Sequence, residues 1–296
     1  MNTRPSNSPH SPSTEPASIE SLLAEARRRL LAAGIEAAGL EARLLVGYQL
    51  GMDAAGLIAH GEDVLSDAQI DAARSLIAQR LNGRPIAYLL GQREFWSLPL
   101  RVDERCLIPR SDTELLVARA LGRLREGPAR VIDLGTGSGA IILALKNEQP
   151  QIEAWASDAS PGALAIATTN ARDLHLDVHW LQGHWLDALT PRPCFDMIVS
   201  NPPYIDPSDP HLQQGDLRFE PRTALVAADG GLSDLATIVR QAGQCLRPGG
   251  WLLLEHGHTQ APSVRRLLEE RGFVAIGSHR DSAGHERVTE GQLPDE

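Results

Sequence analysis

An Asn-Pro-Pro-Tyr segment at residues 201–204 combines residue types that can bind a planar amino group. Each proline fixes its own φ and keeps the residue before it extended, so the segment is rigid. The prolines bring carbonyl acceptors without N–H donors, and the side chain of Asn201 adds another acceptor oxygen. A group bound here must therefore bring hydrogens, and Tyr204 can stack against it if it is flat. An NH2 group on a conjugated centre meets both conditions, whereas the alternative is an ordinary proline-rich turn.

A glycine-rich loop at residues 135–139 follows the apolar stretch 131–134, a pattern typical of a strand that turns into a helix. In a doubly wound sheet this turn lies at the carboxyl ends of the strands, where ligands bind. Asp158 ends the next apolar stretch roughly 20 residues on, where a carboxylate can accept hydrogen bonds from ribose hydroxyls. A glycine-rich turn without a ligand is the alternative, and Asp158 makes it the weaker one. The pattern therefore predicts a nucleoside site.

The spacing within this loop distinguishes between nucleoside ligands. Its glycines follow G-x-G-x-G with Asp133 two residues ahead, whereas the dinucleotide fingerprint is G-x-G-x-x-G. A pyrophosphate ligand is therefore disfavoured. An adenosyl ligand that carries an amino acid fits better, because backbone groups of the loop and a nearby carboxylate can hold a zwitterion. The predicted cofactor is S-adenosylmethionine.

The nitrogen at the proline-rich turn must be activated, because amide resonance is strong enough to give a rotation barrier of about 18–20 kcal/mol. As this nitrogen attacks the sulfonium methyl, positive charge moves onto it and its hydrogens become more acidic. Hydrogen bonds to Asn201 and to the Pro202 carbonyl then strengthen in the transition state, which lowers the barrier. We predict Asn201, Pro202 and Tyr204 as catalytic residues, with Pro203 also binding substrate. Neither a metal nor a strong general base is expected.

Alternating strand and helix patterns from Ser111 onward predict the sheet that positions both segments. The alternation is typical of an α/β, Rossmann-like fold with a mostly parallel sheet and helices on both faces. A helix over 111–124 is expected to begin with Ser111 and Glu114 as a capping pair. Strands are expected at 130–134, 152–157, 178–181, 195–200 and 251–255.

Helical periodicity in the first part of the chain predicts a small amino-terminal helical domain. Its third helix is expected to begin with a capping box of Ser66 and Gln69. The predicted divisions are a disordered tail at 1–17, the helical domain at 18–85, a linker hairpin at 86–110 and the methyltransferase domain at 111–296. The predicted apolar helix faces are Ile19, Leu22, Leu23, Ala26 and Leu30, then Leu40, Leu44, Leu45 and Tyr48, and then Ile70, Ala73, Ile77 and Leu81.

Length and composition exclude several classes of protein. At roughly 150 residues per domain, 296 residues suffice for about two domains. The net charge of −10 repels polyanions, so nucleic acid is not expected as a partner. Cys106, Cys194 and Cys245 are too widely spaced for a disulfide framework or a zinc site and suit a reducing compartment. Without a signal-peptide pattern or an apolar run of roughly 18 residues, the protein is expected to be cytoplasmic, with no membrane partner.

The Asn-Pro-Pro-Tyr motif behind an S-adenosylmethionine loop resembles methyltransferases of planar nitrogens, either nucleobase amines or the glutamine amide. Further segments narrow this resemblance to the bacterial release factor glutamine methyltransferases, the HemK/PrmC family, and the likeness covers about residues 19–290. The segments that carry it lie at 83–88, 91, 95, 107–110, 113–114, 209–216, 218–221, 254–257 and 281–288.

The resemblance implies transfer of a methyl group to N5 of the glutamine in the Gly-Gly-Gln loop of peptide chain release factors, which modulates translation termination. The release factor is then the protein partner, recognised in part by the helical domain, and a monomeric enzyme is expected. An aromatic residue after the third strand contacts the cofactor in this family, and Trp185 matches it. The implied cofactor contacts are Gly135, Thr136, Gly137, Ser138, Gly139, Asp158, Trp185 and Asn201.

Three other functions fit parts of the pattern. A nucleobase methyltransferase would need a basic surface, which the net charge of −10 disfavours. A methyltransferase for a ribosomal-protein glutamine shares the motif, but the segment 209–216 favours the release factor. A catalytically silent S-adenosylmethionine binder is disfavoured by the intact motif. The chain departs from the family at Ser111-Asp112, where many relatives have Pro-Glu, and at His184, where an acid is common. Structural roles are expected for His211, His256 and Glu255.

Overall fold

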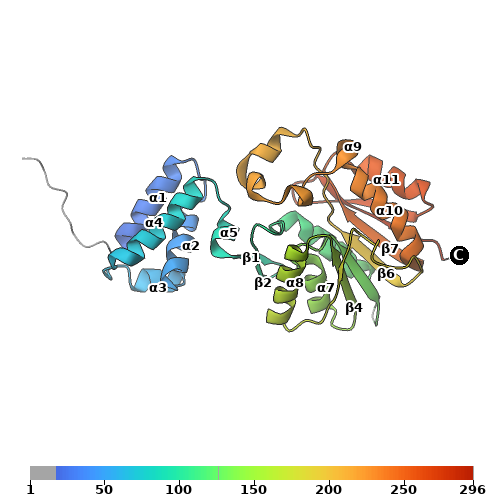
Figure 1. Ribbon diagram of the computed structural model, residues 1–296, viewed down its shortest axis with the longest axis horizontal. Helices are drawn as coiled ribbons and strands as arrows, with labels where there is room; N and C mark the ends of the chain where they lie inside the picture. Colours follow the sequence, from blue (N-terminus) through green and yellow to red (C-terminus); the bar gives the residue numbers. More distant parts are fainter. Residues whose placement is uncertain (1–17, 126, 296) are drawn as a thin grey trace, which may run out of the picture. The chain divides into compact units, whose positions relative to one another are not determined.

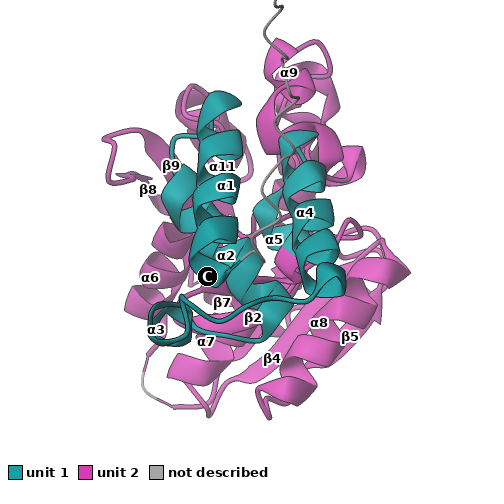
Figure 2. Ribbon diagram, turned by 90° about the vertical axis from the view of Figure 1, so that its left-hand side faces the viewer, with its two compact units in different colours: residues 1–89 teal, residues 90–296 magenta. Residues whose placement is uncertain are grey.

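The computed structural model describes residues 18–125 and 127–295, so the tail predicted at 1–17 lies outside the described residues. The chain divides into two compact units between Leu89 and Leu90 (Figure 2). The first unit holds the amino-terminal helices, and the second holds the hairpin and the large sheet (Figure 1). Within the described ranges no helix is long and apolar enough to cross a membrane.

Short helices build the first unit: α1 (Ile19–Ala32), α2 (Ala38–Leu50), α3 (Ala54–Ala59), α4 (Asp67–Leu81) and α5 (Ile86–Leu90), whose last residue lies past the boundary. At the start of α1 the Ser18 hydroxyl accepts a hydrogen bond from the N–H of Ser21. Ser66 and Gln69 form the predicted capping box of α4, so this prediction is confirmed. Gly51 caps the carboxyl end of α2, and its φ of 66° is left-handed, a conformation that suits glycine.

The buried face of α2 differs from the predicted one. Three side chains predicted to face the core are largely exposed, namely Leu40 (52%), Leu44 (40%) and Tyr48 (55%). The buried side of the helix consists of Ala38, Glu41, Ala42, Leu45, Val46 and Gly47. Glu41 takes a core position because its Oε2 pairs with Nε of Arg80 at 2.7 Å. Since α2 carries apolar residues around most of its circumference, helical periodicity alone could not select the correct face.

The second unit opens with a hairpin of β1 (Gln92–Phe95) and β2 (Leu98–Arg101). Both turn residues, Trp96 and Ser97, have positive φ, which matches the twist of the strands. The N–H of Trp96 donates to Oε1 of Glu114 at 3.0 Å. The predicted capping pair of Ser111 and Glu114 is therefore wrong. The chain forms the short 3-10 helix η1 (Ser111–Thr113) before α6 (Glu114–Arg123), which has no side-chain cap.

A seven-stranded sheet in the order β5-β4-β3-β6-β7-β9-β8 forms the centre of the second unit. The strands are β3 (Arg130–Leu134), β4 (Glu153–Asp158), β5 (His179–Gln182), β6 (Phe195–Ser200), β7 (Leu246–Glu255), β8 (Val274–Arg280) and β9 (Glu286–Gln292). Strands β3 to β7 are parallel, and β9 runs antiparallel to both β7 and β8. The predicted fold class is confirmed, although β7 begins at Leu246, earlier than predicted.

Strands β8 and β9 were not expected from the sequence. Two polar residues of β9, Thr289 and Glu290, are buried in the structure, and such residues in a segment with glycine are typical of a loop. Glu290 is accommodated because Arg119 and Arg123 of α6 both donate to its Oε1. Ion pairs between segments far apart in the sequence thus accommodate a buried carboxylate in β9, which lies between β7 and β8.

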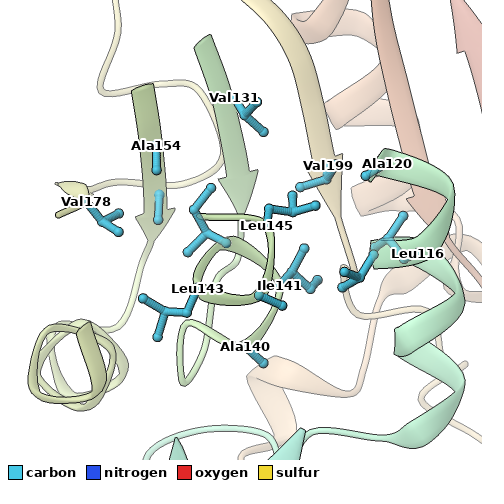
Figure 3. Close-up of a cluster of buried hydrophobic side chains, with 14 of the residues drawn as sticks. Leu116, Ala120, Val131, Ala140, Ile141, Leu143, Leu145, Ala154, Val178 and Val199 are labelled. Carbon is cyan, nitrogen blue, oxygen red and sulfur yellow. The ribbon is translucent and has the colours of Figure 1, made fainter. Parts of the chain in front are cut away.

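Hydrophobic clusters lie on both faces of the sheet, covered by the helices α7 (Ala140–Glu148), α8 (Pro161–Asp173), α10 (Ser233–Cys245) and α11 (Ala261–Glu270) in addition to α6. On one face, Val131 and Val199 of the sheet belong to the same cluster as Ile141 and Leu145 of α7 (Figure 3). On the other face, Ile132 belongs to a cluster with residues of α10 and α11. Because β3, β4 and β6 are parallel neighbours, the segments that follow them meet at one edge.

Candidate active site

The glycine loop between β3 and α7 is held against the end of β4 by backbone hydrogen bonds. The N–H groups of Gly135 and Thr136 donate to the Ser157 carbonyl at 2.8 and 3.0 Å. The N–H of Gly137 donates to Oδ2 of Asp158 at 2.9 Å. Gly135 and Gly137 have φ of 71° and 57°, which other residues adopt at a cost. Burial raises the pKa of Asp158, while the hydrogen bonds that it accepts from backbone N–H groups favour its ionised form.

Asp133 braces this loop from inside the protein. Its side chain is fully buried, and its Oδ2 accepts a hydrogen bond from the Thr136 hydroxyl at 2.6 Å. Burial raises the pKa of Asp133 to about 7, and its Oδ1 has no hydrogen-bond partner among the described groups. Asp133 therefore supports the conformation of the loop and does not face a ligand.

A cavity of about 540 Å³ lies beside the loop. Among the predicted cofactor contacts, the cavity walls include Gly135, Gly137, Asp158, Trp185 and Asn201, but not Thr136, Ser138 or Gly139. Thr136 and Ser138 are buried. A Cβ at Gly139 would lie 3.0 Å from Cδ1 of Leu143 and 3.3 Å from Cβ of Ala167, so this glycine permits helix packing. The remaining wall residues are those at 104–107, 159, 160, 163, 183, 184, 203, 221, 223, 224, 226 and 234.

Trp185 also lines this cavity. It follows β5, whereas Asp158 ends β4. Its ring lies so close to the loop that a Cβ at Gly135 would be 2.9 Å from its Cζ3. Its indole N–H donates to Oδ1 of Asp234 at 3.2 Å, which fixes the plane of the ring. His184 also lines the cavity, with its Nε2 3.9 Å from the same carboxylate oxygen. Sequence reasoning had no signal for Asp234.

The Asn-Pro-Pro-Tyr turn follows β6 and is tied down at both ends. The Asn201 side chain donates from Nδ2 to the Thr113 hydroxyl at 3.1 Å. The Tyr204 hydroxyl donates to Oε1 of Glu255 at 3.3 Å, and burial raises the pKa of Tyr204. The Tyr204 carbonyl accepts a hydrogen bond from Nε2 of Gln260 at 3.0 Å. The turn is therefore rigid through tertiary contacts as well as through its prolines.

A second, smaller cavity of about 70 Å³ is also lined by residues of the turn. Three predicted substrate residues, Asn201, Pro202 and Tyr204, line it, whereas Pro203 lines the larger cavity. Three residues belong to the walls of both cavities, namely Leu107, Asn201 and Ala224. The smaller cavity is completed by Arg110, Ile205, Leu217 and Leu225. Asn201 thus stands where the two cavities meet.

The segment that closes the smaller cavity is anchored by a buried carboxylate. This segment contains η2 (Pro210–Gln213), η3 (Gly215–Phe219) and η4 (Arg222–Ala224). After η3, Oε2 of Glu220 accepts a hydrogen bond from the N–H of Ile108 at 3.1 Å, and Oε1 pairs with Arg110. Burial raises the pKa of Glu220, and Arg110 opposes this shift. No spacing rule indicated this contact between residues so far apart in the chain.

The residues expected to have structural roles occupy different environments. The His211 side chain is exposed, and its Nδ1 lies 2.7 Å from Oδ1 of nearby Asp209. His256 is buried, with its Nε2 2.7 Å from the Thr289 hydroxyl, and burial lowers its pKa. Glu255 is buried directly beneath the turn through its bond from Tyr204. In the described part of the chain, no three His, Cys, Asp or Glu side chains group so that they could hold a metal ion.

Two family models match the two units. Residues 21–91 match the PrmC N-terminal domain, and residues 112–218 match the methyltransferase small domain. The release factor glutamine methyltransferase of Salmonella typhimurium is 50% identical over 254 residues, which cover 86% of this chain and 91% of that protein. The chain belongs to the release factor glutamine methyltransferase family. The family predicted from the sequence is thus confirmed.

Other comparisons extend this assignment. The release factor glutamine methyltransferase of Aliivibrio fischeri is 43% identical over 276 residues, which cover 93% of this chain and 97% of that protein. Among solved structures, a methyltransferase from Pyrococcus furiosus superposes with a TM-score of 0.52 at 15% identity and covers 73% of this chain and 97% of that one. At this identity the likeness shows the fold alone. The release factor glutamine methyltransferase family membership therefore rests on the sequence relatives.

Proposed function

We propose that this protein transfers a methyl group from S-adenosylmethionine to N5 of the glutamine in the Gly-Gly-Gln loop of peptide chain release factors. The observation that carries the proposal is the position of Asn201 on the walls of both cavities. A cofactor in the larger cavity and a carboxamide in the smaller one would meet at this residue. The relatives named above act, by their names, on release factor glutamine.

The larger cavity suits S-adenosylmethionine. Its volume of about 540 Å³ falls in the range of small-molecule sites, roughly 300–1,000 Å³. Open space lies beside Gly137, where a side chain would project, so a ligand can approach the backbone there. Asp158 lines the same cavity, which supports its proposed role as acceptor of hydrogen bonds from ribose hydroxyls. When bound, the cofactor supplies an electrophilic methyl group on a sulfonium.

The smaller cavity suits a glutamine side chain. Leu107, Leu217 and Leu225 make its walls apolar, as methylene groups require, and Asn201 and Pro202 provide acceptors. The Asn201 Oδ1 atom and the Pro202 carbonyl would accept the two hydrogens of the carboxamide nitrogen. As that nitrogen gains positive charge these hydrogen bonds strengthen, and the rigid turn keeps them in place. Tyr204 also lines the cavity, so the predicted stacking of its ring on the flat amide is proposed from this position.

A direct test uses the purified full chain with labelled S-adenosylmethionine and a release factor. Label should appear on the release factor and should be absent when its Gly-Gly-Gln glutamine is replaced by alanine. A ribosomal protein and a DNA duplex serve as alternative acceptors. Equal labelling of the intact and the replaced release factor, or labelling of an alternative acceptor instead, would reject the assignment. Sedimentation of the same sample tests the predicted monomer.

A further inference from the structure

Two buried polar side chains, Thr113 and Glu255, lie next to the Asn-Pro-Pro-Tyr turn without lining either cavity. Thr113 is 4% exposed and Glu255 is 1% exposed. The Thr113 hydroxyl accepts from Asn201 Nδ2, and Oε1 of Glu255 accepts from the Tyr204 hydroxyl. Interaction with the Thr113 side chain lowers the pKa of Glu255, against the larger effect of burial, which raises it. Each of these two groups therefore holds one polar side chain of the turn.

We propose that Thr113 and Glu255 are positioning residues that hold the Asn201 carboxamide with its Oδ1 toward the substrate cavity. The proposal rests on the function proposed above and deepens it. A threonine hydroxyl has one hydrogen, and an ionised carboxylate can only accept. In the proposed arrangement the hydrogen of Thr113 points toward Glu255, and a lone pair of the hydroxyl remains for the NH2 group of Asn201.

The direction of the Asn201 carboxamide decides whether a substrate amide can bind. With Nδ2 bound to Thr113, Oδ1 points the other way, and no described residue donates a hydrogen bond to it. In this orientation Asn201 presents an acceptor to the NH2 group of glutamine. Rotation of the carboxamide by half a turn would present N–H groups to N–H groups, and the substrate nitrogen would lose an acceptor. The buried network therefore selects the productive orientation.

Burial of the Glu255 side chain at the end of β7 carries an unfavourable free energy of desolvation. Its Oε2 has no hydrogen-bond partner among the described groups, and burial raises its pKa to about 7. An apolar residue there would avoid this desolvation penalty. Besides Thr113 and Tyr204, the charged groups that act on the carboxyl are Arg287, which favours its ionised form, and Asp112, which opposes it. We attribute the burial of the Glu255 carboxylate to its proposed role in positioning Asn201.

Protonation of Glu255 should loosen the orientation of Asn201. A protonated carboxyl can donate, which frees the Thr113 hydrogen to donate to Asn201 Oδ1 and permits the rotated carboxamide. The active form is therefore the ionised one, and turnover should fall as the pH falls through about 7. Glu255→Gln should remove this acid limb from the pH profile.

Steady-state kinetics with a release factor test the proposal. Thr113→Val and Glu255→Gln should lower kcat by roughly 10- to 100-fold, because misplaced catalytic groups cost about this much, while the donor Kd stays within about twofold. Thr113→Ser restores the hydroxyl and should recover most of the rate. Thr289→Val and Glu290→Gln are matched controls, because both residues are buried and hydrogen-bonded elsewhere on β9. These controls should keep kcat within about twofold.

A readout that needs no turnover separates this proposal from the proposed function. In nitrogen-15-labelled protein, the Asn201 side-chain NH2 signal, assigned by its loss in Asn201→Asp, should move in Thr113→Val and stay in place in Thr289→Val. If the wild type does not methylate release factor, the proposed function fails, and this signal still decides the positioning role. An unmoved signal in Thr113→Val, or Thr113→Ser as impaired as Thr113→Val, overturns the proposal.

Discussion

The Glu220 carboxylate accepts a hydrogen bond at 3.1 Å from the backbone N–H of Ile108, a residue 112 positions earlier in the chain. The other oxygen of the same carboxylate pairs with Arg110. This contact joins the segment after the hairpin to the segment that closes the smaller cavity. It holds together cavity walls that come from distant parts of the chain.

Replacement of Glu220 by alanine should weaken both stability and turnover. It leaves the N–H of Ile108 buried without a partner, which costs about 1–3 kcal/mol. Because the cavity wall loosens, kcat/KM for the release factor should fall more than the affinity for S-adenosylmethionine. All five tryptophans lie in the second unit, so urea unfolding followed by tryptophan fluorescence reports on this unit. Glu153→Gln, which breaks a partly exposed pair with Arg130, should cost less than about 1 kcal/mol.

Asn201→Ala should separate chemistry from cofactor binding. The loss of an acceptor that strengthens in the transition state is expected to lower kcat by about 100-fold or more. The donor Kd should change by less than about tenfold, because the other walls of the larger cavity remain. Asn147→Ala, an exposed change on α7, should leave both quantities unchanged. Wild-type turnover in Asn201→Ala would remove the proposed catalytic role.

Gly135→Ala should weaken donor binding. A Cβ there would lie 2.9 Å from Cζ3 of Trp185, and the φ of 71° adds strain. The left-handed conformation costs alanine roughly 1–2 kcal/mol, so the free loop should relax away from it, and binding must then restore it. A loss of donor affinity of about tenfold is therefore expected by calorimetry. Gly122→Ala on α6 has open space around it and should leave the affinity unchanged. Equal affinities in both variants would contradict the proposed cofactor site.

Asp133→Asn should change how stability depends on pH. Burial raises the pKa of Asp133 to about 7, so the folded protein holds a proton that the unfolded chain releases near pH 4. The stability that this proton contributes is present at low pH and is lost as the pH rises toward about 7. The free energy of unfolding of the wild type should therefore fall relative to that of Asp133→Asn across this range. Parallel curves by tryptophan fluorescence would show that Asp133 is ionised throughout.

The sequence by itself determined the elements that carry the chemistry. The glycine loop, Asp158 and the Asn-Pro-Pro-Tyr turn are local patterns, since glycine and proline restrict the backbone at their own positions. The central parallel strands β3 and β6 were equally readable, because strands buried on both faces are largely apolar runs. From the alternation of these strands with helices it followed that the loop and the turn lie at one edge of the sheet.

Only the tertiary structure decided which partners these residues meet. The face of α2, the acceptor role of Glu114 toward Trp96 and the burial of Glu290 in β9 all depend on groups from other segments. The same holds for the bond between Asn201 and Thr113, 88 positions apart in the chain. Periodicity and capping rules describe neighbours within one element, whereas a buried polar group takes whatever partner the packing of distant elements brings to it.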